Sequence, residues 1–173
     1  MVGIARPDME IGEAFVGEGA EAAHVNVVLG KREGSVGQAW ATALATPSAG
    51  HAPFMAVIQP GLPVKPLTLF VNKATIDGEP HARLTYGAAQ AGVAGGVADA
   101  VAEGTISRDE VDGLLVIAAV WVNPAAHDEQ AVYRNNRDAT RAALAASIQH
   151  VPKIDEVLDG RDVPENPYFK PER

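Results

Sequence analysis

The chain has 173 residues, which fits one domain with a core large enough to fold independently. Apolar residues make up 47% of the chain and aromatic residues 5%, so we expect a packed globular protein built mainly from small side chains. The net charge of −8, without a basic run, excludes nucleic acids and anionic membrane surfaces as expected partners.

Cysteine and targeting signals are both missing from the sequence. The absence of cysteine excludes disulfides, thiol nucleophiles and metal sites with thiolate ligands. Acidic residues near the start, Asp8 and Glu10 among them, and the lack of an apolar segment there argue against a signal peptide. No apolar run is long enough to cross a bilayer, so we expect a cytoplasmic protein without membrane contact.

The first predicted elements form a hairpin. Residues 10–16 are expected to be a strand, and a glycine turn leads into an apolar strand over residues 23–30. Because alternate side chains of a strand share a face, Val25 packs inward while His24 and Asn26 lie together on the other face. Such a pair can hold a small polar reactant, although two satisfied polar residues on a half-buried strand remain the alternative.

The middle of the chain carries a second polar pair. A helix is predicted over residues 35–46 with Ser35 as its N-cap, and a short buried strand over 54–58. After a proline-rich loop, residues 67–76 are expected to form a strand on which Lys73 and Thr75 share one face. The alternative explanation is an edge strand whose Lys73 points to solvent and prevents edge pairing.

The second half of the chain is predicted to be mainly helical. We expect a turn at 77–80, a short strand or connector at 82–86, and a helix at 86–104 with Gln90 in its first turn. The small residues of that helix would let it lie very close to a sheet. A short helix is predicted after the capping box at Ser107, over residues 107–113, and a central strand over 114–122. The last helix is expected at 128–150, and an irregular tail at 152–173.

Common site motifs are absent from the sequence. There is no phosphate-binding Walker loop, no dinucleotide fingerprint and no nucleophile elbow. The five histidines are scattered without the spacing of metal ligands, so we expect no metal site. Periodicity and spacing therefore predict a single α+β domain with two polar strand pairs, and they do not identify a reaction.

Three ordered blocks of sequence resemble the formaldehyde-activating enzymes. They are GEAFVGEGAEAAHVNVVLG, FMAVIQPGLPVKPLTLFVNKATI and YGAAQAGVAGGVADAVAEG, at residues 12–30, 54–76 and 86–104. The resemblance runs from about residue 12 to residue 150 and is weaker in the tail. It implies one domain over residues 1–173 with a two-layer α+β fold and a left-handed βαβ crossover, similar to the ribosomal protein S5 domain 2-like fold.

The resemblance also implies an activity. Enzymes of this family are lyases of one-carbon metabolism and formaldehyde detoxification that condense formaldehyde with tetrahydromethanopterin, giving the methylene adduct and water. The pterin is a co-substrate, no metal takes part, and the family forms a cytoplasmic homopentamer with the pterin in a cleft between subunits. The family's catalytic histidine falls on His24. Its pterin- and carbon-contacting positions fall on Asn26, Met55, Lys73, Thr75 and Gln90.

These residue types suit the implied chemistry. A pterin nitrogen attacks formaldehyde to form a carbinolamine, whose hydroxyl must leave as water. A general acid that titrates near neutral pH assists this step, and histidine is such an acid. Lys73, Thr75 and Gln90 could donate hydrogen bonds to the polar edge of the pterin, and Met55 could pack on its ring.

One position departs from the family pattern. The family has aspartate two residues after the histidine, and this chain has Asn26. A carboxylate would favour the protonated imidazole, so the amide is expected to weaken His24 as an acid, and Asn26→Asp is expected to raise the rate near pH 7. Three alternatives remain. The first is a sensor or carrier that binds formaldehyde or a pterin or folate without turnover, and the second is a structural homo-oligomer with a vestigial cleft. The third is an enzyme whose buried Lys73 forms a Schiff base.

Overall fold

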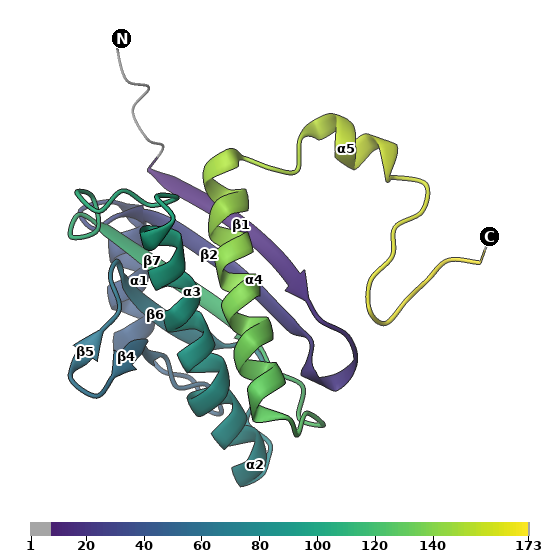
Figure 1. Cartoon of the computed structure of the whole chain (residues 1–173), viewed down its shortest axis with the longest axis horizontal. Coiled ribbons are helices and arrows are strands. Elements are labelled where there is room, and N and C mark those ends of the chain that lie inside the picture. Colours follow the sequence, from purple (N-terminus) through teal and green to yellow (C-terminus); the bar gives the residue numbers. More distant parts are fainter. Residues whose placement is uncertain (1–7, 173) are drawn as a thin grey trace.

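The computed structural model describes residues 8–172, and its centre is a five-stranded mixed sheet (Figure 1). Neighbouring strands are antiparallel, except that β6 and β7 are parallel. The connection between these two strands is helical, so they form a βαβ unit. In spatial order the strands are β1 (Met9–Val16), β2 (Ala23–Lys31), β7 (Leu114–Trp121), β6 (Leu67–Asn72) and β3 (Phe54–Met55). The predicted α+β class, the first hairpin and the central strand are confirmed.

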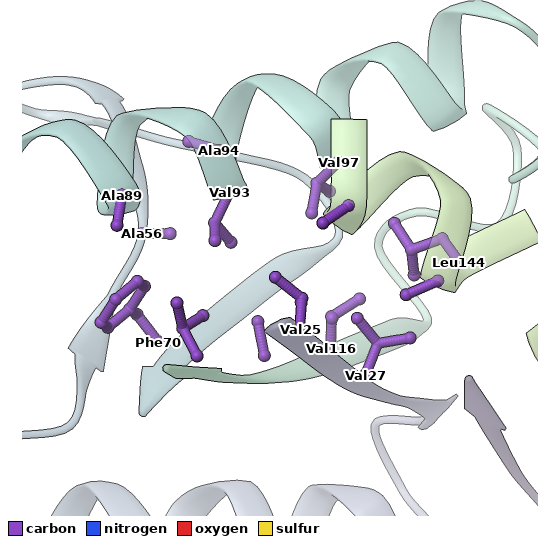
Figure 2. Close-up of a cluster of buried hydrophobic side chains, with 14 of the residues drawn as sticks. Val25, Val27, Ala56, Phe70, Ala89, Val93, Ala94, Val97, Val116 and Leu144 are labelled. Carbon is purple, nitrogen blue, oxygen red and sulfur yellow. The ribbon is translucent and has the colours of Figure 1, made fainter. Parts of the chain in front are cut away.

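Two helices cover one face of the sheet and enclose the core. Helices α3 (Gln90–Ala102) and α4 (Glu129–Gln149) lie side by side across this face in Figure 1. Figure 2 shows Val93 of α3 pointing toward the sheet, where Val25 and Val116 lie beneath it. All three side chains are fully buried. The alternation predicted for β2 is therefore confirmed on its inner face.

The glycines of α3 face the neighbouring helix. A Cβ built on Gly96 would lie 2.4 Å from the carbonyl oxygen of Arg137 in α4, and one on Gly92 would lie 2.5 Å from that of Tyr133. Such distances leave no room for a side chain, so the two backbones are in direct contact. The close approach that we predicted between this helix and the sheet is instead an approach between two helices.

The remaining elements leave most of the other sheet face uncovered. Helix α1 packs on that face at one end, where Val36 lies against Gly30. We call the uncovered remainder the open face; it carries the outward residues of β1, β2 and β7. Across residues 8–172, none of the helices combines the length and hydropathy that a membrane-spanning segment requires. The other elements are α1 (Ser35–Ala45), β4 (Val57–Gln59), β5 (Leu62–Pro63), α2 (Gly78–Arg83), α5 (Ile154–Asp159), and single turns of 3₁₀ helix at Gly19–Glu21 and π-helix at Leu84–Ala89.

The predicted turn and connector at residues 77–86 are wrong, because this segment is helical. Helix α2, the π-helical turn and α3 follow one another without a break over residues 78–102. Buried His81 fixes the start: its Nδ1 accepts a hydrogen bond from the backbone N–H of Asp77 at 3.0 Å, and its Nε2 donates to the carbonyl oxygen of Val122 at 3.0 Å. This anchor joins residues far apart in sequence, so local periodicity does not reveal it.

Several element boundaries also differ from the prediction. The strand expected at 54–58 is divided into β3 and β4, with only Ala56 buried between them. The predicted helix after the capping box at Ser107 is a series of turns, although the Ser107 hydroxyl does accept a hydrogen bond from the N–H of Asp109. Ser35 is the first residue of α1 and not its cap. The tail contains α5 and is therefore not irregular throughout.

The glycine contact between α3 and α4 predicts a position-specific loss of stability. Gly96→Ala should lower the free energy of unfolding by about 2 kcal/mol, because the new methyl group meets a backbone oxygen that cannot move aside. Gly87→Ala is the matched control: nothing lies near its Cβ, so the better helix propensity of alanine should raise stability by up to about 1 kcal/mol. Urea unfolding followed by circular dichroism measures both changes. Equal stability of the two variants would contradict this packing.

Candidate functional site

The sheet register gathers polar side chains on the open face. His24 pairs with Phe15 of β1 on one side and with Trp121 of β7 on the other. Asn26, two residues further along β2, pairs with Glu13. Side chains at directly paired positions point to the same face, so these five residues form one continuous patch.

His24 contacts a carboxylate that the sequence did not indicate. Its Nε2 lies 3.0 Å from Oε1 of Glu13, on the neighbouring strand. The imidazole is 34% exposed and the carboxylate 57% exposed. The ring of Phe15 lies on the same face, with its centroid 6.0 Å from that of the imidazole. The histidine therefore keeps access to solvent while two strand neighbours limit its orientation.

Lys73 lies directly after β6 and reaches across the sheet to β2. Its ammonium group donates a hydrogen bond to the side-chain oxygen of Asn26. Its backbone N–H bonds to the carbonyl oxygen of Val120 at 2.7 Å, so the chain is still paired with β7 at this point. Because β6 lies between β7 and β3, the edge-strand explanation for Lys73 is wrong. Lys73 is also exposed, so the burial that a Schiff-base lysine would need is missing.

A cavity of about 430 Å³ lies over this patch. One wall comes from the sheet, and the opposite wall comes from the tail at residues 165–168. The ring of Tyr168 meets that of Trp121 edge to face, with centroids 6.1 Å apart. The tail therefore returns to the open face of its own chain. The sheet residues that line the cavity are Glu13, Phe15, His24, Lys73 and Trp121.

The other three predicted site residues lie outside this cavity. Gln90 is 7% exposed, and its side-chain amide bonds to both backbone groups of Val57, accepting at 3.0 Å and donating at 3.2 Å. Met55 belongs to β3, pairs with Leu69 and is 41% exposed. Thr75 is exposed and lies beside Gly50. The fold of this chain thus brings together His24, Asn26 and Lys73, but not these three.

Sequence reasoning missed part of the cavity. Glu13 and Phe15 could have been found, because alternation in the first strand and the hairpin pairing place them on the face of His24. Trp121 could have been placed in the same way from the central strand. Nothing in the sequence pattern indicated that the tail folds back, because that contact depends on residues 47 positions apart, Trp121 and Tyr168.

Two carboxyl groups with lowered pKa values serve helix structure and not the cavity. The guanidinium of Arg137 donates hydrogen bonds of 2.6 and 2.7 Å to Asp99 and lowers the pKa of that carboxyl, which joins α4 to α3. The backbone N–H groups at the start of α4 lower the pKa of Asp128, which caps the helix. Their contribution to stability is present above the ordinary aspartate pKa of about 3.9 and is lost as pH falls through the lowered values.

The described part of the chain offers no cluster of side chains suited to bind a metal ion. Among residues 8–172 the side chains of His, Asp and Glu form no group of three that could hold a metal ion. The chemical capacity of the cavity therefore lies in an imidazole, an ammonium group and the carboxylates of Glu13 and Glu165. The amide of Asn26 lies beside it, bonded to that ammonium group. Together these groups can bind a polar ligand and transfer a proton to it.

Comparison with known proteins identifies the family of the chain. A model of the formaldehyde-activating enzyme family (Fae) matches residues 11–169. The chain belongs to the formaldehyde-activating enzyme family. The match includes both the strand with His24 and the tail segment that covers it, so every residue lining the cavity lies within the family region.

The relatives fall into two kinds. The chain is 47% identical to the bifunctional enzyme Fae/Hps of Methanococcoides burtonii over 154 residues, 89% of this chain and 39% of the relative. It is 42% identical to the bifunctional enzyme Fae/Hps of Archaeoglobus fulgidus over 161 residues, 93% of this chain and 41% of the relative. It thus spans about two fifths of these longer proteins. It is also 40% identical to a 5,6,7,8-tetrahydromethanopterin hydro-lyase of Methanosarcina barkeri over 158 residues, 91% and 89% of the two chains.

The tail wall of the cavity can be tested by fluorescence. Deletion of residues 165–173 should raise the acrylamide quenching constant of Trp121 about twofold, because the ring loses the cover of Tyr168. The measurement needs a Trp40→Phe background, since the chain has two tryptophans. Tyr168→Ala should give part of the effect. Unchanged quenching after the deletion would show that the tail does not cover this face.

Proposed function

We propose that this protein is a hydro-lyase that condenses formaldehyde with tetrahydromethanopterin, giving the methylene adduct and water. The observation that carries the proposal is that His24 of this chain lies partly exposed on the wall of a cavity that Lys73 also lines. Membership of the formaldehyde-activating enzyme family supports the substrates, and the similarity to a protein named as a tetrahydromethanopterin hydro-lyase supports the reaction.

The cavity residues suit the steps of this reaction. One pterin nitrogen attacks the carbon of formaldehyde, and the resulting carbinolamine carries a hydroxyl group. Protonated His24 gives its proton to that hydroxyl, the C–O bond breaks, and water leaves. The second pterin nitrogen then attacks the iminium carbon and loses a proton, which restores protonated His24. Fixing both nitrogens near the carbon supplies a further part of the rate.

The polar pair beside His24 has a binding role in this scheme. Lys73 and Asn26 form one hydrogen-bonded unit at the cavity, which presents an ammonium group to a ligand. An ammonium group can donate hydrogen bonds to the polar edge of a pterin. The site contains no metal in this proposal, and tetrahydromethanopterin acts as a co-substrate.

A cleft between subunits completes the proposed site. The open face exposes apolar side chains, Ile11 and Phe15 among them, that a second copy of the chain would cover. We place Met55 and Thr75 against the pterin from an adjoining subunit. Gln90 contributes by holding the backbone of Val57, which follows Met55 closely in the chain. The assembly is a cytoplasmic homopentamer of single-domain subunits, residues 1–173, with a left-handed βαβ crossover as in the ribosomal protein S5 domain 2-like fold.

The first test is the rate of methylene-tetrahydromethanopterin formation. The protein should accelerate the reaction over the uncatalysed rate, and His24→Ala should remove about a hundredfold of that acceleration, because the leaving hydroxyl loses its acid. His127→Ala is the matched control. That histidine also faces a glutamate, Glu21, at 3.1 Å, but lies outside the cavity. A rate equal to background with the unmodified protein would overturn the proposal.

The geometry changes the expectation for Asn26. Its side-chain oxygen accepts from Lys73, whereas Glu13 contacts His24, so a carboxylate at position 26 would pair with the ammonium group. Asn26→Asp should therefore leave the rate at pH 7 within about threefold of the unmodified protein, and not raise it as the sequence alone suggested. Asn123→Asp, outside the cavity, controls for the added charge. A rate at pH 7 that rises about tenfold with Asn26→Asp but not with Asn123→Asp would restore the interpretation that a carboxylate at position 26 strengthens His24 as an acid.

A further inference from the structure

The structure points to a role for Glu13 that deepens the proposed function and rests on it. We propose that Glu13 is a positioning residue: its carboxylate holds the proton of His24 on Nε2, so that Nδ1 is the nitrogen that donates a proton to the leaving hydroxyl. The contact that motivates this assignment is the 3.0 Å distance between Nε2 of His24 and Oε1 of Glu13.

The charge of the carboxylate decides which ring nitrogen carries the proton in this contact. An ionised carboxylate presents only lone pairs, so an unprotonated nitrogen 3.0 Å from it would be repelled, and the nitrogen that faces it is the one that carries a hydrogen. In the neutral ring the single proton then sits on Nε2, and Nδ1 is left as an acceptor. A second proton can bind only at Nδ1. It is this second proton that the ring can give to a substrate while its contact with Glu13 is kept.

The strands make the contact a built feature and not an accidental surface pair. Glu13 and His24 lie diagonally across neighbouring antiparallel strands, since Glu13 pairs with Asn26, two residues from His24, and both side chains point to the open face. The Phe15 ring, at the position directly paired with His24, restricts the imidazole further. Since the backbone of both strands is fixed by the hairpin, the carboxylate and the ring can meet without ordering a loop.

The other charged groups of the cavity do not compete for this role. Lys73 follows β6, and its ammonium group is bound to Asn26. Glu165 reaches the cavity from the tail, and among residues 8–172 the ion pair of His24 is with Glu13 and not with Glu165. Glu13 is the carboxylate in contact with the ring. Because Glu13 is more than half exposed, solvent screens the attraction, and its main effect is on ring orientation and tautomer and not on stability.

A second histidine provides an internal reference. His127 faces Glu21 through Nδ1 at 3.1 Å, whereas His24 faces Glu13 through Nε2. The same reasoning therefore assigns opposite tautomers to the two rings. A method that distinguishes the ring nitrogens should resolve this difference within one sample.

The tautomer can be measured without any assay of activity. Long-range ¹H–¹⁵N correlation spectra of the full chain, recorded where the rings are neutral, should show His24 with its proton on Nε2. Glu13→Gln should give a mixture of tautomers, because an amide can either donate or accept. His127 should not change. Glu18→Gln, which removes the same charge in the turn outside the cavity, should leave both rings unchanged. A His24 proton mainly on Nδ1, or a spectrum unaffected by Glu13→Gln, would overturn the proposal.

Kinetics then connect the tautomer to the reaction. Glu13→Gln should lower kcat about tenfold while the KM for tetrahydromethanopterin stays within about twofold, because proton donation is impaired and binding is not. Glu13→Asp should recover part of kcat, and Glu18→Gln should retain all of it. An unmodified protein without activity would overturn the proposed function but leave the spectra as a test of Glu13. An active protein whose kcat is insensitive to Glu13→Gln would overturn the role of Glu13 alone.

Discussion

Strand β2 divides the molecule into a packed side and a chemical side, and the rest of the structure depends on that division. Its inward residues, Val25 among them, are fully buried beneath α3 and α4. Its outward residues, His24 and Asn26, lie on the open face. Burial of the inner face fixes the register of the strand, since a shift by one residue would exchange the two sets of side chains. The position of the site therefore follows from the core.

The two faces are covered in different ways. On the packed side, the glycines of α3 bring its backbone against that of α4, which keeps both helices on the same face of the sheet. On the open side, α1 covers one end only, and the tail reaches the cavity at residues 165–168. A rigid sheet with a thin, partly exposed cover can hold reacting groups in place and still admit a ligand.

Four polar groups of the open face at and beside the cavity form two separate pairs. Glu13 contacts His24, while Lys73 contacts Asn26. The carboxylate of Glu13 thus contacts the imidazole of His24, and the ammonium group of Lys73 contacts the amide of Asn26, both on β2. In the proposed reaction, an amide at position 26 is compatible with His24 as the acid, because the carboxylate that contacts the imidazole comes from β1. Replacing the family's aspartate with Asn26 therefore leaves a negative charge, that of Glu13, beside His24.

The sequence by itself determined the alternation of β2, the central strand, the last helix and the α+β class, because each follows from the period of nearby side chains. Its ordered blocks also indicated the family, and they named His24, Asn26 and Lys73, which meet at one place. Only the tertiary structure decided that Gln90 holds Val57 and that the tail returns to Trp121. These contacts join distant parts of the chain, and local periodicity carries no information about which distant partners meet.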